Sequence, residues 1–430
     1  MQEAMTFEML DESPGLRVNQ WAAEGVSRLN RRFFTTAATV ALALLFFAGD
    51  IKNSSAFTWI PFDLTAIVAV ALVIFSALSL LAGGGKVSRQ ILWMCALFFL
   101  LAMASLWTQW TSYALDKAVR LFTIALAAAL LPGVVLTRLW QVRLFVALII
   151  LSGMLISSGE IVQLLRGATI SEKITGISSG SVSLGRSAGI ALVGLFTWAT
   201  AGRIQRYWWA LLCVPLFLIL VASGSRGPVI FAVAVAAFVA LRWSIMKIGS
   251  AVVISLLLVA VALLIAFGPP LPQQSVKRIE DFLTLRYDNS SLERVYAGRT
   301  ALTVIEKTPA GLGIGGFGRV YNFGHVTNRV YPHNLVLEIA AECGWIPAAF
   351  FVLLMFLALR RAYRAARADP RLRPFFAVLL FAFGNSLVSG DANDNRIVYA
   401  LICVALQCTE LIRQSLAEDA QTSIPAWASR

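Results

Sequence analysis

Five arginines stand at the ends of apolar segments or in the polar loop that joins two of them. They are Arg186, Arg226, Arg294, Arg299 and Arg396. Guanidinium groups stay charged and bind two phosphate oxygens at once. Small residues such as Gly224 and Gly227, beside Arg226, let a phosphate approach the backbone closely. The set therefore predicts an anion site, although each arginine taken alone could instead reach the membrane surface or pair with a nearby carboxylate.

The chain has only two histidines, and one of them stands where it could move a proton. His333 follows Tyr331 and Pro332, precedes Asn334 and opens a long apolar segment. A neutral imidazole is a good general base near neutral pH. Two roles stay open for His333, deprotonating an acceptor group or only orienting it. His325 is interpreted as an ordinary loop residue.

Several other residues could support such a site. Glu338 lies within an apolar segment, where ionisable side chains are functional candidates by default. The candidate supporting residues are Asn334, Glu338, Arg299 and Asp391.

Common cofactor and metal motifs are absent. The sequence Gly313-Ile-Gly315-Gly316-Phe-Gly318 matches a dinucleotide fingerprint by letter, but no strand precedes it and no helix follows in the required way. We interpret it as a flexible turn. Walker A, CxxC, HExxH and Asp-x-Asp patterns do not occur, and Asp391 with Asp394 offers too few ligands for a cation. We expect no metal and no cofactor.

The composition identifies the elements that must position these residues. The chain has 430 residues, of which 58% are hydrophobic and 14% charged, and its mean hydropathy is +0.76. Soluble domains are usually about 45–50% apolar and about 25% charged. A polytopic membrane protein is therefore predicted. The five cysteines show no metal-ligand or disulfide spacing.

About twelve apolar runs approach the length that a membrane-spanning helix needs, which is roughly 20 residues. The predicted divisions are a cytoplasmic N-terminal segment 1–32, spans one to nine within 33–267, a large outer loop 268–332 with a helix near 291–307, spans ten to twelve within 333–413, and a cytoplasmic tail 414–430. The tenth span is predicted at 334–359. Long loops in compact membrane proteins are usually functional.

The net charge of +13 reflects orientation in the membrane rather than nucleic-acid binding. With both termini in the cytoplasm, the cytoplasmic segments hold 20 of the 36 Lys and Arg residues. Six arginines between Arg360 and Arg373 contribute most clearly to this bias. The five arginines of interest lie on the opposite side, against the usual trend.

At this point the residues resemble the O-antigen ligase superfamily over roughly 180–400. The resemblance rests on Arg226 in Ser-Arg-Gly, on Arg294 with Pro309 and Gly311-Leu-Gly313-Ile-Gly315-Gly316-Phe317 after it, and on His333-Asn334 with Leu337, Glu338, Glu342 and Gly344. The superfamily includes O-antigen ligases, O-antigen polymerases and protein O-oligosaccharyltransferases.

The resemblance implies an all-α, GT-C-like membrane enzyme in the bacterial inner membrane, with its site facing the periplasm. It implies an undecaprenyl-diphosphate-linked glycan as donor and a metal-independent, inverting transfer. Arg226 and Arg294 match the family's diphosphate-binding arginines, and Arg186 and Arg396 are added from position alone. His333 matches the family's loop histidine. Lipid A–core would be the acceptor of a ligase, and surrounding lipids the other partners; we expect a monomer or a weak oligomer.

The compact chain favours the ligase within this superfamily. A polymerase often carries, in an outer loop, an arginine with glycine eleven positions later, and no arginine in the predicted outer loops of this chain has that spacing. Protein-targeting members tend to be longer. A transporter of a lipid-linked glycan is the distant alternative, because buried charges and many spans also suit a transporter.

Overall fold

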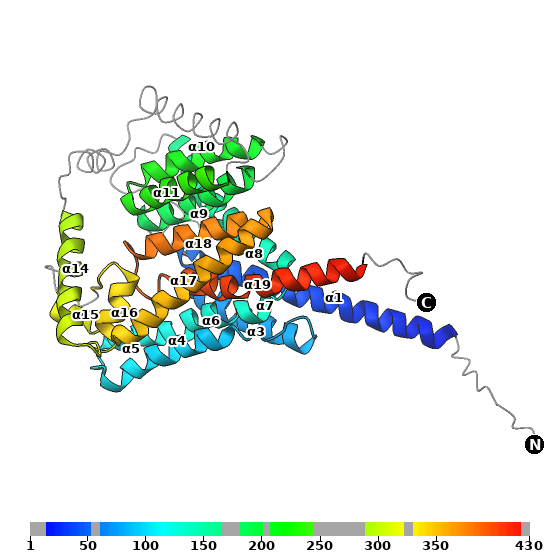
Figure 1. The fold of residues 1–430 in the computed structure, drawn as a ribbon, viewed down its shortest axis with the longest axis horizontal. Helices are drawn as coiled ribbons and strands as arrows, with labels where there is room; N and C mark the ends of the chain where they lie inside the picture. The colour runs from blue at the N-terminus through cyan, green and yellow to red at the C-terminus, as the bar shows by residue number, and fades with distance from the viewer. Residues whose placement is uncertain are drawn as a thin grey trace, which may run out of the picture.

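The structure is a computed structural model, described here for residues 14–52, 61–165, 181–200, 207–243, 289–321 and 330–422. Within these ranges all regular secondary structure is helical (Figure 1). The end of the region predicted for spans one to nine, the first part of the predicted loop, His325 and the last eight residues lie outside them.

The described helices occur in the following order along the chain. The amino-terminal part contains α1 (Pro14–Leu45), α2 (Ala48–Lys52), α3 (Leu64–Leu81), α4 (Ile91–Met103), η1 (Ala104–Trp107), α5 (Ser112–Arg120), a π-helical turn η2 (Leu121–Ala125), α6 (Leu126–Leu130), α7 (Pro132–Val135) and α8 (Leu139–Leu165). The middle contains α9 (Ser181–Thr200), α10 (Tyr207–Ala222), α11 (Arg226–Arg242) and α14 (Asn289–Lys307). The carboxy-terminal part contains α15 (Phe317–Val320), α16 (Leu335–Cys343), α17 (Trp345–Ala368), η4 (Pro370–Leu372), α18 (Arg373–Ser386) and α19 (Arg396–Thr422).

Six helices of the described ranges are long and apolar enough to cross a membrane. They are Leu64–Leu81, Ser112–Val135, Leu139–Gly159, Val182–Ala199, Trp345–Ala368 and Arg396–Ala417. Ile91–Trp107 and Leu211–Ala222 are apolar but shorter. The predicted all-α, multi-pass membrane protein is thus confirmed in outline. The count of twelve spans and the outer loop stay predictions.

The interior is built around α19. Its residues from Val398 to Leu406 are almost fully buried, and α6, α17 and α18 pack against it. Tyr399 joins the layers, with ring centroids 5.4 Å from Phe98 of α4 and 6.1 Å from Phe351 of α17. On the other side, α9 packs against α8, α10, α11 and α18.

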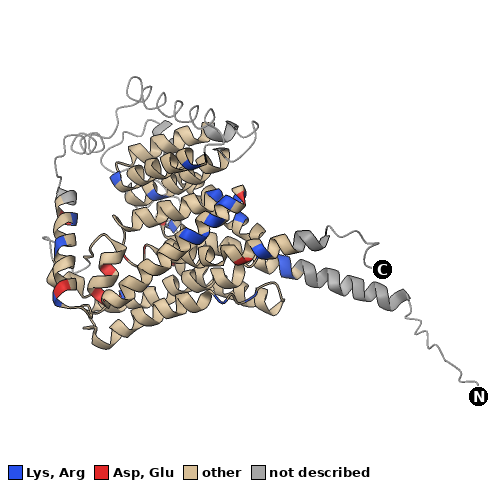
Figure 2. Ribbon diagram, viewed as in Figure 1, with Lys and Arg blue, Asp and Glu red and all other residues tan. Residues whose placement is uncertain are grey.

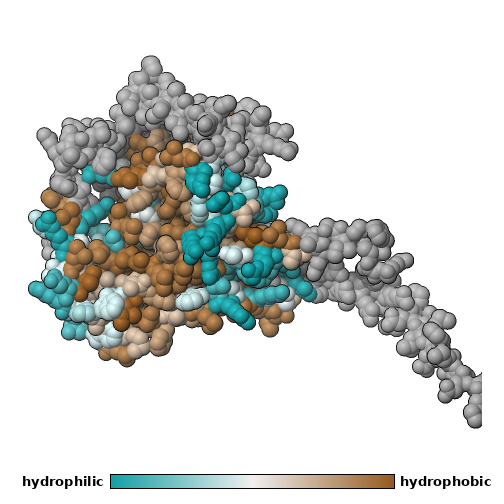
Figure 3. All heavy atoms as spheres, in the orientation of Figure 1, coloured by the Kyte–Doolittle hydropathy of each residue, from teal (hydrophilic) through white to brown (hydrophobic). Residues whose placement is uncertain are grey.

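The molecule has two chemically different ends. Lys and Arg gather where α17 ends and α18 begins, on the side from which α1 and α19 project (Figure 2). Acidic residues lie around α14 and α16 at the opposite end. Between the two ends, the visible face carries an apolar band with hydrophilic residues on both sides (Figure 3). This banding is what a lipid bilayer requires of an embedded protein.

The apolar run 334–359 differs from the single span predicted. It forms two helices, α16 and α17, separated at Gly344, whose φ is +100°. A Cβ at this position would lie 2.9 Å from the carbonyl oxygens of both Pro309 and Ala310. Trp345 N also donates to Pro309 O at 3.1 Å. Glycine is therefore required here by both backbone conformation and close approach, and the run is broken into a short buried helix and a 24-residue helix.

Candidate functional site

A cavity of about 500 Å³ opens at the end of the molecule opposite the basic end. Its walls come from the end of α1 and α2, the starts of α3, α9 and α19, and from α5, α14 and the segments before α16 and α19. The polar side chains lining it are Asp50, Thr65, Arg120, Ser183, Arg186, Ser187, Arg294, Tyr331, His333, Ser389, Asp394 and Arg396. Four of the sequence-predicted residues, Arg186, Arg294, Arg396 and His333, therefore share one cavity.

Arg186 lies in the second turn of α9 and is held against the segment before α19. Its Nη2 donates to Ser389 Oγ at 3.0 Å. A Cβ at Gly390, whose φ is +78°, would stand 2.4 Å from Arg186 Nη2. The Nε of Arg186 is buried and has no hydrogen-bond partner among the described residues. Glycine at 390 thus lets the Arg186 guanidinium approach the backbone closely.

A tight turn presents Asp394 and Arg396 to the cavity. Asp391 Oδ1 accepts hydrogen bonds from Asn393 N at 2.9 Å and Asp394 N at 2.8 Å, and Asn395 Nδ2 donates to Asp391 O at 2.9 Å. Asp391, a predicted supporting residue, does not line the cavity. Its side chain caps the turn, as aspartate does in many turns, so its contribution to the site is indirect.

Asp394 is one of two acidic residues that line the cavity, and Asp50 is the other. Burial raises the pKa of its carboxyl, and the neighbouring Asp391 raises it further, whereas Arg186 and Arg396 lower it. Burial also raises the pKa of Tyr331, which stands on the same cavity. The cavity therefore combines fixed positive charge with groups that hold protons more tightly than usual.

Arg294 reaches the cavity from α14, the helix that the sequence predicted at 291–307. Tyr321 Oη donates to Glu293 O at 2.8 Å and ties the first turns of α14 to the chain beyond it. Ala297, Ala301 and Val304 on one face of α14 pack with Phe317 and Tyr321. Arg299, a predicted candidate, is exposed and does not line the cavity.

His333 has an unusual backbone conformation. Its φ is +57°, the one positive φ among the described residues other than glycine. Next to it, Asn334 is the N-cap of α16, and its Oδ1 accepts from Leu337 N at 3.1 Å. The imidazole lies against the Tyr331 ring, with centroids 4.4 Å apart. Non-glycine residues in this region cluster at functional sites, and Asn334 is assigned a capping role that fixes the position of His333.

Glu338 and Glu342 do not line the cavity but hold its walls together. Lys117 Nζ of α5 lies 2.6 Å from Glu338 Oε1 and 2.8 Å from Glu342 Oε2, and all three side chains are almost fully buried. Glu338 Oε1 also accepts from Ala392 N at 3.2 Å. The ion triad thus joins α5 and α16 to the turn that carries Asp394 and Arg396. The predicted supporting residue Glu338 is a positioning group in this arrangement.

The glycine-rich segment 311–318 is held firmly, contrary to the flexible turn expected. Leu312 N and Gly313 N donate to the carbonyls of Ala341 and Glu342, both at 2.9 Å. Gly315 N donates to Glu342 Oε2 at 2.9 Å. The segment therefore joins the end of α16 to the chain after α14.

Comparison with known proteins bears directly on this arrangement. Residues 211–353 match the family model described as O-antigen ligase. Over this segment the chain is thus similar to O-antigen ligases. The match covers most of α10, then α11, α14, α15, α16 and the start of α17, and it includes Arg226, Arg294 and His333. The predicted resemblance is confirmed, and members of the family are glycosyltransferase-type enzymes, ligases or polymerases. A search of the curated proteins found no match.

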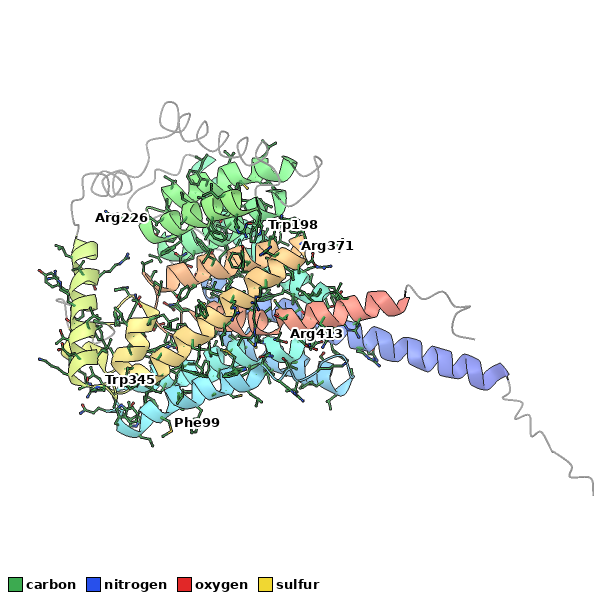
Figure 4. All side chains as sticks on the ribbon, in the orientation of Figure 1. Phe99, Trp198, Arg226, Trp345, Arg371 and Arg413 are labelled. Carbon is green, nitrogen blue, oxygen red and sulfur yellow. The ribbon has the colours of Figure 1, made fainter. Side chains whose placement is uncertain are left out.

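Arg226 belongs to the family segment but not to the cavity lining. It begins α11, on the side of the molecule where α14 lies (Figure 4). The residue before it packs closely on α9, because a Cβ at Gly185 would lie 3.0 Å from Ser225 Cβ. Arg226 thus lies outside the lining of the cavity that holds the other three arginines predicted to bind phosphate.

Sequence reasoning missed Arg120, Asp50 and Lys117. Arg120 and Asp50 line the cavity, and Lys117 lies at the centre of the ion triad. Lys117 and Arg120 stand inside the apolar run 114–131, where the rule that flagged Glu338 would also have flagged them. Among the described residues, no three His, Cys, Asp or Glu side chains are grouped as a metal site would require.

Proposed function

We propose that this chain is an O-antigen ligase. It moves a glycan from undecaprenyl diphosphate to a sugar hydroxyl of lipid A–core at the periplasmic face of the inner membrane. The proposal rests on the cavity that Arg186, Arg294, Arg396 and His333 share at one end of the molecule. The match to the O-antigen ligase family model supports it.

The arginines suit a diphosphate leaving group. Arg120, Arg186, Arg294 and Arg396 surround a space of about 500 Å³, large enough for a diphosphate and the first sugar. When the acceptor oxygen attacks the anomeric carbon, the bond to the diphosphate breaks and its electron pair stays on the phosphate oxygen. Guanidinium groups fixed around that oxygen stabilise the growing charge. Removal of one hydrogen-bond donor of this kind typically lowers the rate by about 100- to 1,000-fold.

His333 is proposed to act on the acceptor. Its backbone is held by the Asn334 cap and its ring by Tyr331, so the imidazole has a fixed direction in the cavity. It either accepts the proton of the attacking hydroxyl or orients that hydroxyl toward the anomeric carbon. Attack from the side opposite the diphosphate inverts the anomeric configuration.

The two ends of the molecule support the proposed orientation. The basic end, with the arginines between Arg360 and Arg373, would face the cytoplasm. Helices α9 and α19 start at the cavity with Arg186 and Arg396 and run toward the basic end. The cavity would then lie at the periplasmic side, where lipid-linked glycans and lipid A–core are both accessible.

An in vitro transfer assay tests the proposal. Purified protein in detergent with EDTA receives an undecaprenyl-diphosphate glycan together with lipid A–core, with a Ser-rich acceptor protein, or with no second acceptor. Transfer to lipid A–core in EDTA supports the metal-independent ligase. A glycan ladder without added acceptor would instead identify a polymerase, and labelled protein an oligosaccharyltransferase. Absence of product in every arm would overturn the enzyme assignment in favour of transport.

The two histidines provide a matched pair of variants for the same assay. His333→Ala is expected to reduce transfer by about 100-fold or more, the typical range for a positioned acid–base group, while donor binding is largely retained. His325→Ala removes the other histidine and is expected to leave transfer unchanged. Full activity of His333→Ala would remove this residue from the mechanism.

A further inference from the structure

A second cavity lies at the basic end of the molecule, far from the first. It has a volume of about 210 Å³ and is lined by Arg143, Val146, Ala147, Trp198, Pro370, Arg371, Leu372, Pro374 and Phe375. These residues come from the start of α8, the end of α9 and the turn between α17 and α18. Figure 4 shows Trp198 and Arg371 close together at this end. The volume equals about seven water molecules, enough for a small polar headgroup.

The charges at its mouth are unbalanced. Arg143 Nη2 lies 2.5 Å from Asp369 Oδ2, so these two charges compensate one another. Asp369 Oδ1 also accepts from the backbone N of Arg371 at 2.9 Å, which fixes the turn. The Arg371 guanidinium is exposed, and no carboxylate of the described residues pairs with it. The mouth therefore carries an excess positive charge that suits a phosphate group.

The floor of this cavity is apolar and continues along the surface. Val146, Leu372 and Phe375 are buried, and Trp198 is 42% exposed at the rim. Ala147 shares one face of α8 with Leu151 and Leu155, because residues four apart lie above one another on a helix. Leu151 and Leu155 are 49% and 59% exposed. An apolar track of roughly 12 Å thus leads from the cavity toward the middle of the apolar band.

We propose that this cavity binds an anionic phospholipid. The phosphate would lie at Arg371, the headgroup beside Trp198, and one acyl chain along Leu151 and Leu155. Basic pockets between helices at the cytoplasmic side are suited to acidic lipid headgroups, and tryptophan is common at the level of the headgroups. A free phosphate would leave the apolar track unused, and a zwitterionic lipid would leave the charge at the mouth only partly compensated.

Native mass spectrometry of the full chain in detergent tests the proposal. Dioleoylphosphatidylglycerol, dioleoylphosphatidylcholine and inorganic phosphate are added in separate titrations. The anionic lipid is expected to bind about fivefold more tightly than the zwitterionic lipid, because one guanidinium near the membrane surface contributes about this factor. Inorganic phosphate is expected to bind more weakly than either lipid.

Two single-charge variants separate the cavity from its surroundings. Arg371→Gln is expected to weaken binding of the anionic lipid about fivefold and to abolish the preference over the zwitterionic lipid. Arg367→Gln removes an exposed arginine of the same basic end, outside the cavity lining, and is expected to change binding less than about twofold. Equal losses in both variants, equal binding of the two lipids, or phosphate binding as tight as lipid binding would each overturn the proposal.

Discussion

Lys117 and Glu338 form an ion pair, 2.6 Å between Nζ and Oε1, with both side chains about 1% exposed. With Glu342 as a third member, the pair connects two helices and the turn that presents Asp394 and Arg396. Charges removed from water this completely are tolerated only when they are paired and hydrogen-bonded. The triad therefore fixes the relative positions of three walls of the cavity.

Lys117→Met should be strongly destabilising, because it leaves two buried carboxylates without their cation. We expect a loss of about 3–5 kcal/mol in the free energy of unfolding, measured by denaturant or thermal unfolding in detergent. The triple change Lys117→Met, Glu338→Gln and Glu342→Gln should recover part of it, because no unpaired charge remains. Lys86→Met removes an exposed lysine as a control. A loss for Lys117→Met no larger than that control would contradict a structural role of the triad.

Gly390→Ala should impair donor binding through Arg186. The new Cβ would lie 2.4 Å from Arg186 Nη2, so the guanidinium must move away from the cavity wall. Gly83→Ala is a matched control, because Gly83 also has a positive φ, +68°, but an added Cβ there meets nothing within 4 Å. Both variants should lose about 1 kcal/mol of stability from backbone strain. Only Gly390→Ala should weaken the affinity for undecaprenyl diphosphate, measured by titration in detergent; equal affinity in the two variants would argue against the contact.

Arg186→Lys should not preserve donor binding. Lysine keeps the positive charge but lacks the planar pair of donors that grips two phosphate oxygens, and it cannot maintain the contact with Ser389 in the same geometry. We expect about tenfold weaker binding of undecaprenyl diphosphate, again by titration. Arg299→Lys, at an exposed arginine outside the cavity, should bind as the unaltered chain does. If Arg186→Lys also bound normally, only charge at this position would matter.

Donor affinity should fall as pH rises, because of Asp394. Burial and Asp391 raise the pKa of the Asp394 carboxyl, so at low pH it is neutral and leaves the positive charge of Arg186 and Arg396 to the ligand. As pH rises through this raised pKa, the carboxylate forms and competes with the diphosphate for the same guanidinium groups. Binding of the anion should in turn raise the Asp394 pKa by the same coupling.

Asp394→Asn isolates this effect from the titration of the diphosphate itself. The variant and the unaltered chain should bind donor equally at low pH, and the variant on the order of tenfold more tightly once Asp394 is ionised. Affinity measured at a series of pH values provides the check. Parallel pH profiles would exclude a coupling between Asp394 and the bound anion.

Much of the site was predictable from residue type and position. Arginines at segment ends and a histidine after a proline stand out against an apolar sequence, and Arg186, Arg294, Arg396 and His333 do share a cavity. The roles of Glu338 and Asp391 were not predictable, because they depend on Lys117 and on a turn that only the folded chain brings near. Arg226 shows the opposite case, because it matches a family motif but does not line the cavity.

The fold was predictable to the level of its apolar segments. Hydropathy finds the run 334–359 but not its division, because a single glycine with positive φ has no effect on an average over many residues. The contacts that demand Gly344 come from Pro309 and Ala310, whose proximity the sequence does not encode locally. The contacts of the glycine-rich segment 311–318 could not be predicted for the same reason. Its hydrogen bonds are made to α16, which is distant from it in the sequence, and they hold in place a stretch that the sequence suggests is flexible.

The residues that line the larger cavity range along the sequence from Phe46 to Ile397. Its walls therefore come from segments made early and late in synthesis. A chain that is still being made lacks α19, and with it Arg396 and the turn that supports Arg186. Contacts between such distant parts of a sequence form late in folding. The cavity can therefore be complete only after α19 has been made, so under the proposed function a partly synthesised chain would lack a complete site for the lipid-linked donor.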